Sequence, residues 1–344
     1  MKQNNKYSVV VCGGGHAGIE AALILNKLRL RHRKNAILPI IKGPSGDHIL
    51  VEIAAFIANQ LNKRFNINIR YRSFDNLELI EKAYEVKIVV RNKEKIKFKA
   101  PNLEILEAQV TNSKTLKNIC KNVDVVISTV GITRQKDGLT YMDVDFQANA
   151  NLIDEAKKRG VKKFIYISVL NGEKLRHLKI CYAKEKLGDY LKSSGLDYCI
   201  VRPNGFFSDM KDFLKMAKTG KVYLFGDGKL KLNPIHGIDL AKEVVNVIGQ
   251  DKKEINIGGP DLLSQNKIAE LALKAYEKPI KIIHFPDWIR KFTLWSIRKL
   301  TSVKTYGPIE FFMTTMVMDM QAPQFGNHKL ENFFNENADN LMGE

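Results

Sequence analysis

The clearest pattern in the chain is an apolar run, a helical pattern and a second apolar run. Residues 164–169 and 198–201 are apolar runs of strand length, and residues 182–193 between them have helical periodicity. This order predicts a βαβ crossover, which requires a parallel sheet covered by helices. Ligands of such sheets bind beyond the carboxyl ends of the strands. Ser168 follows the first strand and Lys184 lies early in the helix, so both are candidate site residues.

The same alternation continues on both sides of this unit. Further strand-like apolar runs occupy residues 7–12, 86–90, 103–108, 123–129 and 255–257. Helical patterns occupy residues 115–120, 143–159, 264–276 and 288–300. The pattern predicts the α/β class, with a Rossmann-type doubly wound parallel sheet.

A glycine loop follows the first strand. Gly13, Gly15 and Gly18 form a G-x-G-x-x-G between the strand at 7–12 and a helical pattern. Glycine permits the tight turn and the close approach of backbone to a pyrophosphate, which the helix N-terminus attracts. We therefore predict that these three glycines bind a dinucleotide.

A second glycine pair competes for this role. Residues 34–84 separate the first βα unit from the strand at 86–90 and are predicted to be an insertion or an irregular segment. Within them, Gly43 and Gly46 follow a strand-like run and precede a helical pattern. Pro44 lacks an N–H donor, so the first loop is preferred.

The strand at 86–90 ends in a basic residue. Arg91 stands where an acidic residue would bind the ribose hydroxyl of NAD. A cation there suits the 2′-phosphate of NADP. The sequence thus favours NADP, with NAD as the alternative.

Several motifs together resemble one family. Ser168 at a strand end, Ala183-Lys184 on the next helix, residues 194–198 (Ser-Gly-Leu-Asp-Tyr) and residues 201–203 (Val-Arg-Pro) resemble an atypical short-chain dehydrogenase/reductase. The branch is the NmrA-like and divinyl chlorophyllide reductase-like group, and the resemblance extends over about residues 86–335. It implies NAD(P) binding, and it implies that the carboxyl-terminal region covers a substrate.

The resemblance also implies roles for individual residues. Lys184 matches the lysine that binds the nicotinamide ribose and supports catalysis, with Ser168 nearby. The family tyrosine position falls on Ile180. Tyr182 and Lys186 form a Tyr-x-x-x-Lys pair, but they are shifted by two residues and so rotated by about 200° around the helix. Lys184, Ser168 and Tyr182 are the catalytic candidates.

Two loops are expected to contact the cofactor. In the family, the loop after the strand at 123–129 passes beside the ribose and nicotinamide, which makes Thr129, Val130 and Gly131 candidates. The loop that begins at Pro203 and Asn204 is expected to lie over the nicotinamide.

Two later segments contain candidate residues. His236 borders the expected pocket as a structural histidine or a general acid, and Asp239 is a candidate helix N-cap. In the pattern at 288–300, apolar residues form one face opposite Arg290, Lys291 and Arg298. We expect this helix to pack on the core, with a substrate pocket, a subunit contact or a membrane-surface contact as alternatives.

Composition narrows the class of protein. The 344 residues are 44% hydrophobic, and no apolar run is long enough to span a membrane. Four cysteines show no metal-binding spacing, so we expect reduced thiols and no metal. The net charge of +18 comes from scattered lysines without a nucleic-acid motif, so we expect no specific nucleic-acid partner. A cytoplasmic monomer or homodimer is the simplest expectation.

The predicted organisation has four parts: a first βα unit at 1–33, the irregular segment at 34–84, the rest of the Rossmann domain at 85–250, and a carboxyl-terminal substrate or interaction region at 251–344. Two functions fit it. The first is an NAD(P)-dependent oxidoreductase acting on an apolar small molecule. The second is a non-catalytic NADP-binding assembly factor or redox-sensing regulator, which the absent tyrosine favours.

Overall fold

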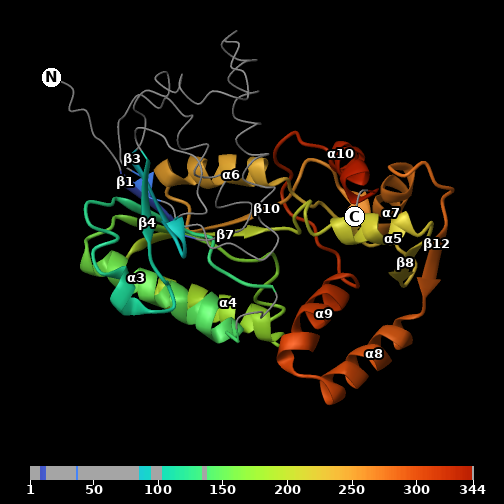
Figure 1. The fold of residues 1–344 in the computed structure, drawn as a ribbon, viewed down its shortest axis with the longest axis horizontal. Helices are drawn as coiled ribbons and strands as arrows, with labels where there is room; N and C mark the ends of the chain where they lie inside the picture. Colours follow the sequence, from blue (N-terminus) through green and yellow to red (C-terminus); the bar gives the residue numbers. More distant parts are fainter. Residues whose placement is uncertain (1–7, 13–35, 38–84, 94–102, 134–137, 343–344) are drawn as a thin grey trace, which may run out of the picture.

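The structure is a computed structural model that describes residues 8–12, 36–37, 85–93, 103–133 and 138–342 (Figure 1). Its main sheet has the order β10-β7-β6-β5-β1-β2-β3-β4, and every pairing in it is parallel. The strands are β1 (Ser8–Cys12), β2 (Ala36–Ile37), β3 (Glu85–Val90), β4 (Leu103–Glu107), β5 (Val125–Ser128), β6 (Lys163–Ile167), β7 (Asp197–Pro203) and β10 (Glu254–Ile257). The predicted fold class is confirmed.

The strand order reverses at β1. From β1 the chain proceeds to β3 and β4 on one side, and from β5 to β6, β7 and β10 on the other. β1 pairs directly with both β3 and β5, and the short β2 makes single bridges to β1, β3 and β5. In a doubly wound sheet the ligand crevice lies at this reversal, beyond the carboxyl ends of the strands.

Two helical layers cover the sheet (Figure 1). On one face lie α3 (Asn149–Lys158) and α4 (Lys179–Lys192), and on the other α6 (Gly237–Asn246), which continues into the short 3₁₀ turn Val247–Gly249. Phe164 and Tyr166 of β6 are fully buried in the core cluster beneath α3 and α4. Because both faces are covered, β5 and β6 are buried along their whole length and consist mostly of apolar residues.

Two predicted helices differ in form. The pattern at 143–159 begins as a π-helix, η4 (Met142–Ala148), before it becomes α3. The pattern at 115–120 is only a 3₁₀ turn, Ser113–Leu116. Asn118 and Asn122 have φ angles of 73° and 60°, and such left-handed residues end a helix.

The carboxyl-terminal region has its own core. Helices α5 (Lys211–Lys218), α7 (Gln265–Lys274) and α10 (Leu330–Met342) pack around Phe213, Ile268 and Phe334. Two small sheets join them, one of β8 (Val222–Phe225) and β12 (Ile282–Phe285), the other of β9 (Lys231–Leu232) and β11 (Leu263–Ser264). A hairpin of α8 (Asp287–Leu300) and α9 (Val303–Thr315) projects below them (Figure 1).

Residues 320–328, which we call the carboxyl-terminal segment, tie this region to the Rossmann domain. Asn204 donates to the carbonyl oxygen of Met320 at 2.5 Å, and Asn233 donates to that of Ala322 at 2.8 Å. Asp239 accepts from the backbone N–H groups of residues 327 and 328, both at 3.0 Å. The polar groups that hold the segment are buried, so the two regions share one interior.

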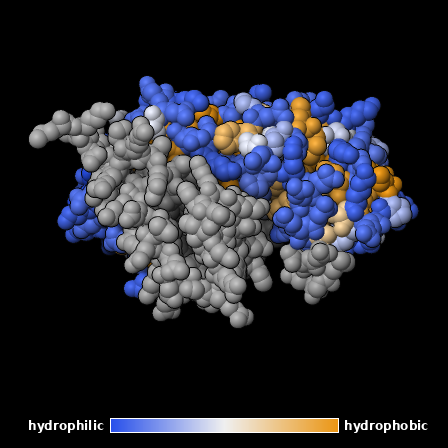
Figure 2. Space-filling model, turned by 90° about the horizontal axis from the view of Figure 1, so that it is seen from above, coloured by the Kyte–Doolittle hydropathy of each residue, from blue (hydrophilic) through white to orange (hydrophobic). Residues whose placement is uncertain are grey.

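The upper face of the molecule, which includes α6, is mostly hydrophilic where described, with separate hydrophobic patches (Figure 2). This agrees with the high content of lysine and arginine in the chain.

Candidate functional site

The loop after β5 lies at the reversal of the sheet. Residues 129–131 follow β5, which pairs with β1, and β1 ends at Cys12 immediately before the first glycine loop of the sequence. The glycines at 13, 15, 18, 43 and 46 lie outside the described residues, so the choice between the two loops stays a prediction. Asn149 fixes the loop after β5, because its buried amide donates to the carbonyl oxygen of Val130 at 3.1 Å and accepts from Ser128.

Lys184 forms an ion pair beside this loop. Its ammonium lies 2.8 Å from Oδ1 of Asp145, whose side chain is fully buried. The other carboxylate oxygen accepts from the N–H of Ile132 at 3.2 Å. Burial lowers the pKa of Lys184, but Asp145 and other nearby groups, Tyr166 among them, together raise it more, so the net pKa lies above its ordinary value. Lys184 is therefore a cation held in place.

The ion pair occupies space that a side chain at residue 131 would fill, and Gly131 has none. A β-carbon at residue 131 would lie 2.7 Å from Oδ1 of Asp145 and 2.9 Å from the ammonium of Lys184. The absence of a side chain therefore lets the loop approach the ion pair closely.

Two buried hydroxyls near the pair have no hydrogen-bond partner among the described residues. These are the side-chain oxygens of Thr129, on the loop after β5, and Tyr166, on β6. Burial raises the pKa of Tyr166, while Lys184 acts in the opposite direction, so phenol and ammonium are close enough to interact. A cation and unpaired hydroxyls at the reversal of a doubly wound sheet fit the ribose hydroxyls of NAD(P).

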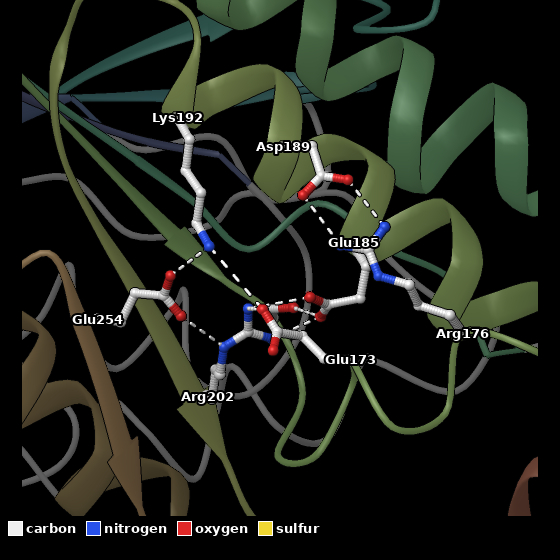
Figure 3. A network of polar contacts seen from close by, with 8 residues as sticks. Glu173, Arg176, Glu185, Asp189, Lys192, Arg202 and Glu254 are labelled. Atoms are coloured by element: carbon white, nitrogen blue, oxygen red, sulfur yellow. Dashed lines mark hydrogen bonds and ion pairs between the residues drawn. The ribbon is translucent and has the colours of Figure 1, made fainter.

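Ser168 belongs to a different group of contacts, around the pair of Glu185 and Arg202 that Figure 3 shows. Its hydroxyl donates to Oε1 of Glu185 at 3.3 Å, and Glu185 binds the guanidinium of Arg202 through both carboxylate oxygens. Both side chains of this pair are almost completely buried. Burial lowers the pKa of Arg202, but Glu185 and Glu254 together raise it by a larger amount, so its net pKa lies above the ordinary value.

The network continues outward to α4 and β10. Glu254 of β10 accepts from Nε of Arg202 at 3.0 Å and pairs with Lys192 of α4 at 2.5 Å. One turn along α4 from Glu185, Asp189 binds Arg176 at 2.8 and 2.9 Å, and that pair is exposed. The buried pair joins β7 to α4, the helix that carries Lys184, and Glu254 extends the network to β10 (Figure 3).

Other predicted site residues lie apart from Lys184. Tyr182 is 46% exposed on the outer side of α4. Asn204, just after Pro203 at the end of β7, donates to Asn233 at 2.8 Å as well as to the carboxyl-terminal segment, and accepts from Gly205 at 2.8 Å. Arg91 is exposed after β3. The structure thus brings together Lys184 and residues 129–131, but not Ser168 and Tyr182, and all these roles stay predictions.

The expected N-cap at Asp239 is wrong. His236 caps α6, since its Nδ1 accepts from the N–H of Ile238 at 3.3 Å. Asp239 lies in the first turn and pairs with Nδ1 of His328 at 2.9 Å. The two imidazole rings stack with centroids 4.4 Å apart, and Phe207 packs against His236. Asp239 therefore binds the carboxyl-terminal segment instead of capping its own helix.

Sequence reasoning missed Asp145, Asn149 and Glu185. Asp145 and Asn149 share the apolar face of the predicted helix at 143–159 with Leu152, and a polar residue on such a face signals a buried contact. Glu185 lies among apolar residues of α4 in the same way. Nothing in the spacing shows which partner each of them has.

Among the described residues there is no group of histidine, cysteine or acidic side chains placed to hold a metal ion. No helix in that part of the chain is long and apolar enough to cross a membrane.

Two curated proteins are similar to this chain in sequence. The chain is 25% identical over 229 residues to the photosystem II assembly factor Ycf39 of Guillardia theta, covering 63% of this chain and 73% of that protein. It is 26% identical over 304 residues to the chloroplastic divinyl chlorophyllide a 8-vinyl-reductase of Cucumis sativus, covering 75% and 71%.

A solved structure shows the same fold. An NADPH-dependent quinone oxidoreductase from Escherichia coli, complexed with NADPH, matches with a TM-score of 0.55 and 14% identity over 89% of this chain and 99% of that one. The NAD(P)H-binding family pattern matches residues 77–251, just over half of the 344 residues. This chain therefore belongs to the NAD(P)H-binding family.

Proposed function

We propose that this protein binds NADP(H) at the carboxyl ends of β1 and β5 and acts as an oxidoreductase on an apolar small molecule. The observation that supports this most is the cation of Lys184 held beside Gly131, together with the hydroxyls of Thr129 and Tyr166, which have no partner in the described part of the chain. Lys184 would donate to the nicotinamide ribose, and Asp145 would orient it. The bound nicotinamide supplies the hydride.

NADP preference and substrate class rest on further points. Arg91 follows β3, at the position that distinguishes the two cofactors in this fold. The reductase relative is named for a chlorophyllide and the structural neighbour for a quinone, both largely apolar molecules. We infer an unsaturated apolar substrate for this chain as well.

A second function is favoured by the positions of the family's proton-transfer groups. Tyr182 is exposed, Ser168 is bound to Glu185, and Lys184 is already paired with Asp145. An assembly factor or redox-sensing regulator that binds NADP without oxidising or reducing it does not require these three side chains to lie together. One relative is named an assembly factor.

Titration with NADPH and NADH tests the site. We would follow nicotinamide fluorescence and thermal stability in the wild type, in Lys184→Gln and in the matched control Lys186→Gln, an exposed lysine on the same helix. We expect Lys184→Gln to weaken NADPH binding at least about tenfold, because it removes a charged hydrogen bond. Equal binding by both variants would contradict the role of Lys184.

A second experiment distinguishes the two functions. Bound NADPH is mixed with short-chain quinones and with vinyl-bearing porphyrins, and its fluorescence is followed in a single turnover. Oxidation supports the enzyme, whereas tight binding without oxidation by any acceptor supports the regulator. Gly15→Asp and Gly46→Asp show which loop binds phosphate, and Arg91→Glu should reduce the preference for NADPH over NADH.

A further inference from the structure

Helix α8 is turned with its aromatic stripe toward solvent. Trp288, Phe292 and Trp295 are 66%, 60% and 54% exposed, whereas Arg290 and Leu294 on the other side are buried. The expectation that the aromatic face packs on the core is therefore wrong. Large aromatic side chains on one exposed stripe indicate a surface that binds something.

The stripe is also basic. Lys299 continues it, with its ammonium 4.5 Å above the ring of Trp295, and Lys291 and Arg298 are exposed along its edge. The sequence pattern predicted that Lys291 lies opposite the aromatic residues. In the structure it lies beside them. Aromatic and basic residues share one face of the helix.

Acidic residues do not offset this charge. Residues 287–315 contain five basic and two acidic residues. Asp287 is paired with Arg290 and Lys291, and Glu310 is buried against Arg298. The hairpin therefore presents a cationic surface.

The face is held rigidly. α9 packs against both α8 and α4, and a β-carbon at Gly307 of α9 would lie 3.0 Å from the hydroxyl of Tyr141 in the core. In Figure 1 the hairpin projects away from the sheet, and α8 is its outer helix.

A lipid surface fits this face better than a second copy of the chain. Tryptophan and phenylalanine side chains are stable at the depth of lipid headgroups, and lysine and arginine bind anionic headgroups. Two copies of the same face would place like charges against each other, and the whole chain has a net charge of +18.

We propose that the exposed face of α8 docks this protein on the surface of an anionic lipid bilayer. Trp288, Phe292 and Trp295 insert among the headgroups, and Lys291 and Lys299 contact lipid phosphates. The proposal stands whichever of the two functions above is correct.

The chain contains its own reporter. Its sequence has two tryptophans, and both lie on this face. We would record tryptophan emission and vesicle co-sedimentation with phosphatidylcholine vesicles, with and without phosphatidylglycerol. We expect a blue shift and sedimentation only with phosphatidylglycerol, and both should diminish as salt rises.

Matched variants place the contact on α8. The double variant Lys291→Glu/Lys299→Glu should reduce binding at least about tenfold, since each basic residue near an anionic surface contributes to affinity. Phe292→Ser should reduce it as well. The controls are Lys229→Glu and Tyr223→Ser, an exposed lysine and an exposed aromatic elsewhere. Thermal unfolding and NADPH titration verify that each variant is folded.

Three results would overturn the proposal. One is no blue shift and no sedimentation with either vesicle. Another is vesicle binding by the wild type that the substitutions on α8 do not weaken, which would place the contact elsewhere. A third is a blue shift that grows with protein concentration without lipid, which would show that a second copy covers the face.

Discussion

Replacing Glu185 with alanine should destabilise the protein far more than replacing Asp189, one turn away on the same helix. Each carboxylate binds an arginine with both oxygens, Glu185 to Arg202 and Asp189 to Arg176. The two pairs differ in burial. The side chains of the first pair are 1% and 7% exposed, and those of the second 55% and 39%.

The magnitudes follow from that difference. Removing one partner of a buried pair costs about 3–5 kcal/mol, because the other charge stays buried without compensation. Arg202 keeps Glu254 at 3.0 Å, so we expect the lower end, about 3 kcal/mol. An exposed pair contributes about 0.2–1 kcal/mol.

Urea unfolding followed by circular dichroism measures both changes. With a slope of about 3 kcal/mol per M, Glu185→Ala should lower the midpoint by about 1 M and Asp189→Ala by less than about 0.3 M. Adding Arg202→Met to Glu185→Ala should recover part of the loss, because it removes the uncompensated charge. Equal midpoints for the two single variants would refute the argument from burial.

Three further predictions concern the site and the carboxyl-terminal segment. Gly131→Ala should weaken NADPH binding at least about tenfold in a fluorescence titration, because its β-carbon would lie 2.7 Å from Asp145; unchanged affinity would place the cofactor elsewhere. Burial raises the pKa of Asp239, but hydrogen bonds and nearby cations lower it more, so its net pKa is below the ordinary value. The stability it contributes should be present above pH about 4 and be lost as the pH falls further, and Asp239→Asn should remove this part of the acid dependence in thermal unfolding. Gly326→Ala should cost on the order of 2 kcal/mol or more in urea, since φ is +84° and a β-carbon would lie 2.1 Å from the carboxylate of Asp239; a neutral result would show that the segment can move away.

The strands and the sheet were predictable because buried parallel strands are continuous apolar runs. The runs at 123–129 and 164–169 correspond to β5 and β6, and their βαβ connection specifies parallel pairing. The helix predicted at 115–120 is wrong because Asn118 adopts a left-handed conformation, and its hydrogen-bond partners, Glu155 and Arg159, are distant in sequence.

Lys184 could be selected from the sequence, but its surroundings could not. A resemblance aligns single positions, whereas the partner of Lys184 is Asp145, which a π-helix presents from 39 residues earlier in the chain. The direction of the aromatic face of α8 was equally inaccessible. A helical period shows that a stripe exists but does not show whether the core or the solvent lies against it.

The contact between Asp239 and the carboxyl-terminal segment has a consequence for the order of folding. The carboxylate is fully buried, and two of its donors belong to residues 327 and 328, which lie 88 and 89 residues later in the chain. During synthesis, α6 is complete long before these donors exist, so until residues 327 and 328 are made the buried carboxylate is paired with Lys242 of its own helix but lacks these two backbone donors. A chain cut before the segment would never gain them, and the nucleotide-binding half should be less stable when it is expressed alone.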